Sequence, residues 1–173
     1  MIPYLVTPPV TLPVSLPEMK AHLRVDGDDE DALIESLQMG AVAMLEGWGG
    51  VLGRCILPQF WAIDVTGPGP HPLPFPDASE IVAEVSGAPL DVLVKMGGAG
   101  VEVSIHDAPA DQAVTIKAKY GLPDERRAAA EVLVKLIVGN WFENREAVVV
   151  GTIAAELPMA ANALIATLRW MRI

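Results

Sequence analysis

The alternation of polar and apolar residues between positions 123 and 146 predicts the longest helix of the chain. Pro123 suits the first helical turn, and strong helix formers fill the segment behind it. Arg127, Glu131 and Lys135 recur every four positions with alternating charge, so they form one narrow polar stripe on the helix. Apolar residues occupy both flanks of this stripe. A helix with so little polar surface should be buried on two sides, and we expect one of those sides to face another subunit.

Two shorter helices are predicted upstream of this one. Ser15-Leu16-Pro17-Glu18 is a capping box that opens a helix running through Leu23. The acidic residues Asp26 to Asp31 are interpreted as the capping residues and first turn of a second helix, whose apolar residues run from Leu33 to Leu45. A calcium loop is excluded, because the sixth residue from Asp26 is not glycine and the twelfth is not glutamate.

Between residues 55 and 120 the pattern changes from helical spacing to alternation, which predicts β-structure. Five strands are expected, at 55–65, 81–86, 91–96, 101–106 and 114–120. The last two alternate cleanly, with apolar residues on one face and mostly polar residues on the other. The proline-rich stretch 67–76 is expected to be a stiff, irregular loop, and glycines 97 to 100 a hairpin turn. The segment is interpreted as an antiparallel meander of about five strands with one dry face.

The order of the elements defines the fold class. Pro158 is expected to begin a last helix that continues to Trp170. Two helices, a β insertion at 55–120 and two further helices make an α+β fold with a helical core, and residues 1–173 are interpreted as one domain. Residues 1–14 contain four prolines and no charged side chain, which favours an extended arm. Such an arm could lie along a neighbouring subunit or cover the chain's own core.

Charge and hydropathy narrow the range of partners. The 173 residues carry a net charge of −10, which argues against affinity for nucleic acid, because binding to a phosphate backbone depends on lysine and arginine. Hydrophobic residues make up 51% of the chain, yet no run approaches the roughly 18–20 uncharged apolar residues of a membrane-spanning helix. We therefore expect the surplus apolar surface to form subunit contacts, with no membrane partner.

Candidate catalytic residues are sparse. His22, His71 and His106 lie far apart in the sequence, and none stands in a metal-ligand spacing. The single cysteine, Cys55, excludes an intrachain disulfide and is interpreted as a buried apolar residue. The amino terminus lacks the basic region of a signal peptide, which favours a cytoplasmic origin. We expect no enzymatic activity, no metal and no cofactor.

A polar cluster closes the long helix. Trp141, Asn144, Arg145 and Glu146 could form a satisfied internal network or a surface used for docking. The residue types alone favour neither interpretation, although Arg145 suits the carboxyl end of a helix.

Several stretches, taken in order, resemble one known family. They are Ser15 to Val25 with the acidic turn after it, Gly53-Arg54, Gln59-Phe60-Trp61, Leu73-Pro74-Phe75-Pro76, Trp141 to Glu146, Gly151, Pro158 and Arg169. Their order and spacing resemble the head-tail connector, or head completion adaptor, proteins of tailed bacteriophages and gene transfer agents. That family has a helical core, with a β insertion in its longer members.

The resemblance implies a structural protein of the virion neck. Such a protein would form a ring of identical subunits, for instance a dodecamer, beneath the portal protein. It would extend the channel through which DNA passes without specific binding, and would receive the next neck or tail protein, a stopper or terminator. The alternative is another oligomeric virion scaffold, such as a tail-terminator-like or stopper ring protein.

Two sets of residues are the candidates for these contacts. The expected subunit or portal interface comprises Val134, Val138, Trp141, Phe142, Asn144, Arg145, Glu146 and Trp170. A channel for DNA should not attract phosphates, so acidic residues are expected to face its lumen. These are Asp26, Asp28, Asp29, Glu30 and Asp31.

Overall fold

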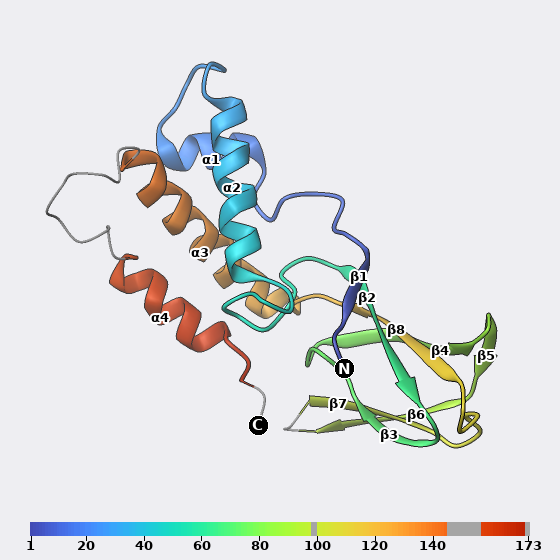
Figure 1. Cartoon of the computed structure of the whole chain (residues 1–173). Helices are drawn as coiled ribbons and strands as arrows, with labels where there is room; N and C mark the ends of the chain where they lie inside the picture. Colours follow the sequence, from blue (N-terminus) through green and yellow to red (C-terminus); the bar gives the residue numbers. More distant parts are fainter. Residues whose placement is uncertain (98–99, 145–156, 172–173) are drawn as a thin grey trace, which may run out of the picture.

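The computed structural model describes residues 1–97, 100–144 and 157–171. In these residues, four helices gather at one end of the molecule and eight strands form two sheets at the other (Figure 1). The helices are α1 (Leu16–Leu23), α2 (Asp31–Leu45), α3 (Asp124–Glu143) and α4 (Met159–Leu168). The strands are β1 (Tyr4–Thr7), β2 (Gln59–Thr66), β3 (Gly69–Pro72), β4 (Ala78–Val85), β5 (Ala88–Leu90), β6 (Val92–Gly97), β7 (Gly100–Ile105) and β8 (Ala113–Tyr120). The predicted α+β class is confirmed.

Helix α3 is the centre of the helical part, because α1, α2 and α4 all contact it. Its most buried residues face α2 and α4 and join one apolar cluster. The polar stripe of α3 is covered by α1: the ring of His22 lies 3.4 Å from the position a Cβ would take at Gly139. Hydrogen bonds with Ser15 lower the pKa of the Glu18 carboxyl most, and the positive charge of Lys135 on α3 lowers it further. Helices α1, α2 and α4 of the same chain therefore cover much of α3, although Val132 on this helix is exposed. The expected contact of one side of α3 with another subunit stays a prediction.

The two amino-terminal helices begin differently. The capping box of α1 is present, with Ser15 Oγ donating to a carboxylate oxygen of Glu18 at 2.7 Å. The start of α2 was predicted too early, since the helix begins at Asp31 with Glu30 as its N-cap. Asp26 to Asp29 lie in the loop before it, at the far tip of the helical part (Figure 1).

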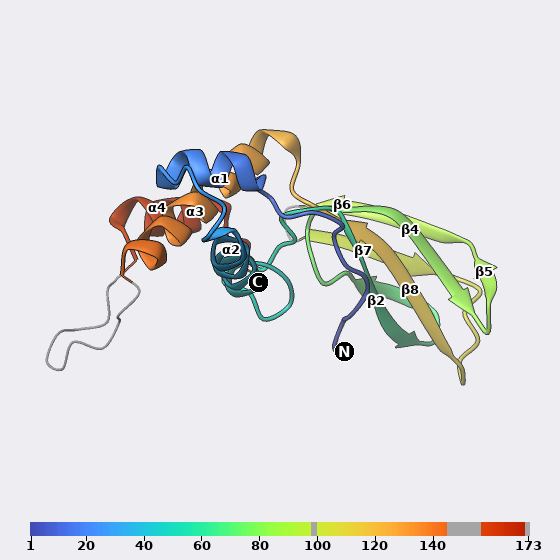
Figure 2. The same ribbon diagram turned by 90° about the horizontal axis from the view of Figure 1, so that it is seen from above.

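The strands form two antiparallel sheets that share one apolar core. The first sheet has the order β1-β2-β8-β4-β5 and the second β3-β7-β6. Figure 2 shows the sheets beside the helices, seen from above. Buried residues of both sheets enclose Phe75, whose ring packs edge to face against Trp61 and Tyr120, with ring centroids 5.3 and 5.0 Å apart. The inward alternation predicted for the last two strands is confirmed, because Val103 and Ile116 are almost completely buried.

The pairing is more complex than a five-stranded meander. The last strand, β8, lies between β2 and β4, so its partners come from well separated parts of the chain. The expected loop 67–76 contains β3, which pairs with β7 at the edge of the second sheet. The expected arm contributes β1, which pairs with β2 of its own chain. None of the described helices is long and apolar enough to cross a membrane.

Candidate functional site and assembly surfaces

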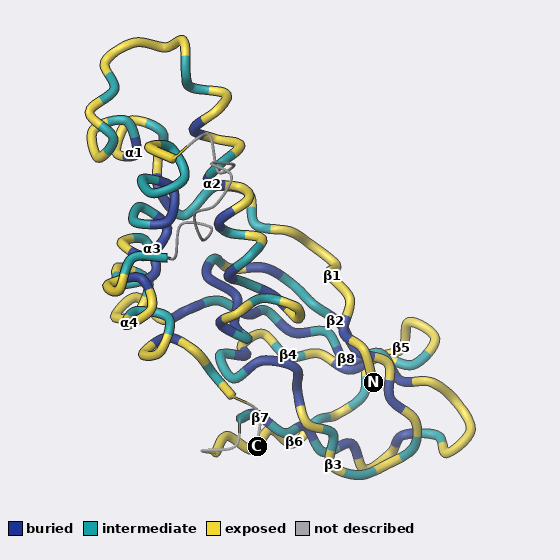
Figure 3. The backbone as a smooth tube through the Cα atoms, turned by 60° about the vertical axis from the view of Figure 1, so that its left-hand side comes forward, coloured by how far each residue is buried: buried dark blue, intermediate teal, exposed yellow. Residues whose placement is uncertain are grey.

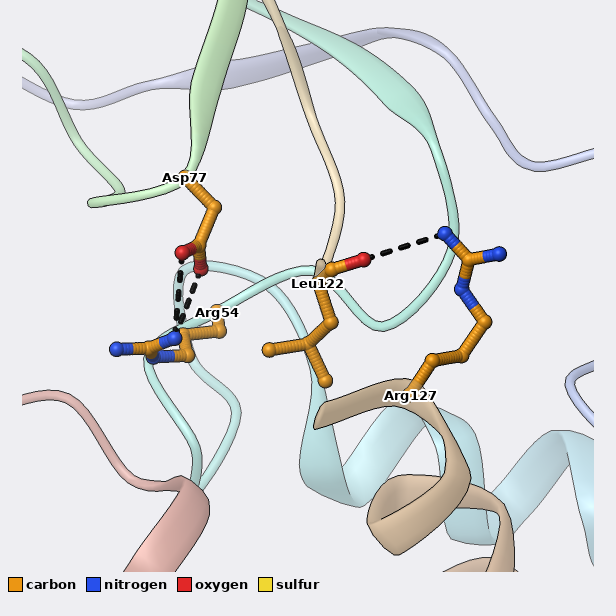
Figure 4. A network of polar contacts seen from close by, with 4 residues as sticks. All are labelled: Arg54, Asp77, Leu122 and Arg127. Carbon is orange, nitrogen blue, oxygen red and sulfur yellow. Dashed lines mark hydrogen bonds and ion pairs between the residues drawn. The ribbon is translucent and has the colours of Figure 1, made fainter. Parts of the chain in front are cut away.

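A partly buried ion pair joins the helical part to the sheets (Figure 4). Arg54, in the loop after α2, directs Nη1 toward both carboxylate oxygens of Asp77, at 3.0 and 3.2 Å. Asp77 directly precedes β4. Burial raises the pKa of the Asp77 carboxyl, and the positive charges of Arg54 and Arg126 partly offset this effect. The pair fixes the loop after α2 against the start of a central strand.

The chain returns from the sheets to the helices beside this pair. Arg127 of α3 donates from Nη2 to the carbonyl oxygen of Leu122 at 3.2 Å, and its Nη1 lies 3.0 Å from Asp124. The Leu122 amide in turn donates to the carbonyl oxygen of Cys55 at 2.9 Å. The outgoing and returning segments are therefore hydrogen-bonded to each other at the junction.

A second polar network lies at the carboxyl end of α2. The Glu46 carboxylate accepts hydrogen bonds from the Ile56 amide at 2.9 Å and from Gln59 Nε2 at 3.0 Å. Gln59 Oε1 accepts one from Trp61 Nε1 at 2.9 Å. Burial raises the pKa of Glu46, although its hydrogen bonds oppose this shift. The bond from the Ile56 amide positions backbone at the junction, the other two join side chains, and no nucleophile is paired with a base in this network.

The predicted interface residues on α3 are not gathered on one surface. Val134 and Val138 are fully buried in the chain's own helical core, so their assignment to a subunit interface was wrong. Trp141 and Phe142 are partly buried and pack against the same core. The Trp141 ring covers Gly40 of α2, where a Cβ would lie 3.5 Å from Cζ3. Trp141 thus contributes to the fold.

The remaining members of this set lie elsewhere. Asn144 is exposed, and its Nδ2 donates to the carbonyl oxygen of Asn140 at 2.8 Å. Arg145 and Glu146 lie outside the described residues. Trp170 follows α4; its amide donates to the Leu52 carbonyl oxygen at 2.9 Å, and its ring lies 3.1 Å from the position of a Cβ at Gly100 of β7. Trp170 therefore bridges the helical part and the second sheet.

The acidic residues occupy the loop before α2 and the first position of that helix, and a lysine neutralises part of this group. Asp26, Asp28 and Asp29 are exposed, whereas Glu30 and Asp31 are half-buried. Lys20 Nζ lies 2.7 Å from Asp28 and 2.8 Å from Asp31, and its hydrogen bond lowers the pKa of Asp28. Asp26 and Asp29 have no ion pair among the described residues.

The sequence interpretation missed two exposed apolar strands at sheet edges. In β1, Tyr4, Leu5 and Val6 are all exposed (Figure 3), and in β6 the same holds for Leu93, Val94 and Met96. The available signal was a run of apolar residues on both faces of a strand, which is unusual at the edge of a sheet. The sequence pattern of β6 was interpreted only as that of one strand of the meander.

The histidines do not form a cluster. His22 lies on α1, His71 on β3 with a ring nitrogen 3.2 Å from the Gly67 carbonyl oxygen, and His106 is exposed after β7. No group of three or more metal-ligating side chains is present in the residues that the structure describes. The thiol of Cys55 is buried, and burial raises its pKa, so it is held as the neutral thiol.

The comparisons with known proteins show a similarity in fold alone. No family model matches the sequence, and no curated protein matches it. Among solved structures, the chain is similar to one described as the neck of an empty GTA particle computed with C6 symmetry, GTA standing for gene transfer agent. The two chains are 20% identical, with a TM-score of 0.72 over 100% of this chain and 97% of that chain. This chain therefore has, from end to end, the fold of a protein found in a particle neck.

Proposed function

We propose that this chain is a structural subunit of the neck of a phage or gene-transfer-agent particle. In this proposal, copies form a ring beneath the portal, continue the DNA channel and connect the head to the next neck or tail protein. The observation that carries the proposal is the likeness in fold to a neck protein over 100% of this chain and 97% of that chain. Because the likeness includes both the helices and the two sheets, it is more specific than a shared helical bundle.

The contacts between the helices and the sheets support a role in which the chain holds two partners in a fixed relative orientation. An adaptor between two protein layers has to hold one contact surface at a fixed orientation to the other. The partly buried pair of Arg54 and Asp77, together with the hydrogen bond between Leu122 and Cys55, fixes the sheets relative to the helices. A largely buried arginine contact, in which Nη1 donates to both carboxylate oxygens, is more rigid than an exposed lysine pair.

The charge distribution suits a passage for DNA. The chain carries a net charge of −10, and the acidic loop projects from the far end of the helical part (Figure 1). We propose that Asp26, Asp28, Asp29, Glu30 and Asp31 face the lumen, where they repel the phosphate backbone and prevent DNA from adhering to the wall. Asp26 and Asp29 would contribute most, since Lys20 pairs with Asp28 and Asp31.

The end of α3 is retained as a candidate contact with the portal. Glu143 and Asn144 are exposed there, and Arg145 and Glu146 follow in the sequence. In this proposal the polar side chains contact the portal, while Trp141 fixes the end of the helix to α2. The two roles assigned to this cluster are thereby divided between neighbouring residues.

The direct test is assembly on a portal. The purified chain would be mixed with portal-containing heads and with tail tubes in separate reactions, and both products imaged by electron cryomicroscopy. We expect a ring on the exit face of the portal. A ring found only on the end of the tail tube would indicate a terminator instead, and no ring in either reaction would reject the proposal.

A further inference from the structure

A cavity between the end of α2, the start of β2 and the amino-terminal segment contains a single charged side chain. Its volume is about 420 Å³, which is within the usual range for a ligand site. The walls include Trp48 and Trp61, with Leu5 and Pro9 from the amino-terminal segment, and Glu46 lies among them. No other residue that lines the cavity is charged. Any group that enters it therefore meets apolar walls and one carboxylate.

The Glu46 carboxylate has only neutral hydrogen-bond donors around it. The Ile56 amide donates to Oε2 at 2.9 Å and Gln59 Nε2 donates to the same oxygen at 3.0 Å. Glu46 forms no ion pair with any residue that the structure describes. In this it differs from Asp77, another partly buried carboxylate, which is paired with Arg54. Because charged groups that lose contact with water are normally paired, the cavity offers a place for a positive charge from outside the chain.

Two indole rings lie beside this carboxylate in the cavity wall. The ring of Trp61 is 3.4 Å from the position that a Cβ would take at Gly47, the residue between Glu46 and Trp48. Trp48 is 38% exposed, although it belongs to the most apolar of the aromatic types. Aromatic rings attract cations, and tryptophan does so most strongly. The combination of a carboxylate and two indoles therefore favours a cation over a neutral or an anionic group.

The rim of the cavity favours a protein over a small cation. Val10, Met39 and Val51 are exposed, and each lies next to a lining residue along the chain or one helical turn from it. An inorganic or small organic cation would leave these apolar side chains in water. Tryptophan, methionine and arginine are enriched at the centres of protein interfaces. The composition of the site thus suits a basic side chain that is presented by an apolar surface.

We propose that this cavity receives an arginine side chain of a partner protein, whose guanidinium pairs with Glu46 and contacts the indoles of Trp48 and Trp61. Arginine suits the site better than lysine, because its planar guanidinium is weakly hydrated and stacks on aromatic rings. The net charge of −10 favours a basic partner over a second copy of this acidic chain. The contact is a property of the single chain and does not depend on the proposed ring.

The indole N–H signals in NMR spectra of the free, full-length protein test the site. The chain has four tryptophans, and single Trp→Phe variants assign their signals. Titration with N-acetyl-arginine amide at about pH 8, where carboxylates are ionised, should move the signals of Trp48 and Trp61 and leave Trp141 and Trp170 in place. N-acetyl-citrulline amide, which has the same shape and no charge, should move none. No response to the arginine amide, or an equal response to citrulline, would overturn the proposal.

Substitutions in the cavity separate its two components. Glu46→Gln should weaken binding of the arginine amide by about tenfold or more, while Glu35→Gln, which removes the same charge from an exposed position of α2, should not change it. Trp48→Leu should weaken binding by about fivefold, read from the Trp61 signal. Because Trp48 is partly exposed, this variant should fold, as unchanged Trp141 signals would show. Equal affinities for the Glu46→Gln and Glu35→Gln proteins would contradict the role of Glu46.

Three further titrations identify the occupant. A short peptide with leucine on each side of the arginine should bind about tenfold tighter than the amide, because the leucines contact the apolar rim; equal affinity would overturn the assignment to a protein. Equal binding of N-acetyl-lysine amide would overturn the choice of arginine. If the Trp48 and Trp61 signals move when the free protein is concentrated, and do not move in Glu46→Gln, the occupant is a second copy and the assignment to a partner is wrong.

Discussion

The indole ring of Trp141 packs over Gly40, so that the last turn of α3 is held against the middle of α2. A side chain longer than that of alanine at position 40 would collide with the indole ring and alter the separation of the two helices. The contact shows why a tryptophan close to an exposed helix end need not be an interface residue, since one face of the ring is already used within the chain.

Replacing Trp141 by alanine should therefore destabilise the free protein. Because the side chain is only partly buried, we expect a loss of about 2–3 kcal/mol, below the range for a fully buried tryptophan. Gly40→Ala is the contrasting variant: its Cβ fits at ordinary contact distance, and the helix should gain about 0.5–1 kcal/mol. Urea denaturation of the free protein measures both. A stable Trp141→Ala protein that failed only in assembly would show that the ring acts at an interface.

The ion pair at the junction should matter more than an exposed pair. Arg54→Ala leaves Asp77 in a partly buried site without its partner, and we expect a loss of about 2–3 kcal/mol. Lys119→Ala removes the exposed pair with Glu80 and should cost less than about 1 kcal/mol. Both are read from denaturant midpoints. Equal effects would mean that the junction does not depend on this pair.

The Glu46 network predicts a pH dependence. Burial raises the pKa of Glu46 above its ordinary value of 4.5, so the folded state holds the proton more tightly than the unfolded state does. The contribution of Glu46 to the free energy of unfolding should therefore be greatest at acidic pH and should fall as pH rises through the raised pKa. Glu46→Gln retains an oxygen that can accept from the Ile56 amide and removes this dependence.

The difference between wild type and Glu46→Gln isolates this residue from the other titrating groups. Urea denaturation at several pH values should give a difference that moves in favour of the glutamine variant as pH increases from about 4.5. A difference that is constant, or that moves the other way, would contradict the assignment of burial as the dominant effect.

Under the proposed function, charge reversal in the acidic loop should convert the channel wall into a site that retains DNA. With Asp26 and Asp29 both changed to lysine, rings should bind double-stranded DNA at low salt, and the affinity should fall steeply as salt increases. Asp107→Lys, Asp111→Lys changes the net charge equally at exposed positions beside the second sheet. DNA binding by the control to the same extent would show that the loop does not line the channel.

Local signals could be predicted from the sequence, and contacts between distant segments could not. The capping box at Ser15 and the alternation leading to Tyr120 depend on neighbouring residues, and both were identified. The positions of β8 and β3 depend on pairing across long separations, and Pro70 and Pro72 concealed a strand that tolerates proline because it lies at an edge.

The candidate interface shows the same limit. The apolar character of Val134 and Val138 was evident, but a helical pattern does not say whether the covering surface is another helix or another molecule. In the structure, the surface that covers them belongs to helices α2 and α4 of the same chain. Leu5 and Met96 are the converse case: their residue types suggested burial, and only the strand order shows that they are uncovered.

The hydrogen bond from the Leu122 amide to the Cys55 carbonyl has a consequence for how such a chain can change during evolution. It places the exit and the return of the sheet segment side by side, and Gly121 permits the approach because a Cβ there would lie 3.1 Å from Pro58. Insertions or deletions between these two points alter the size of the sheets while the helices keep their spacing. The size of the sheets can thus change while the helical frame of the chain stays the same.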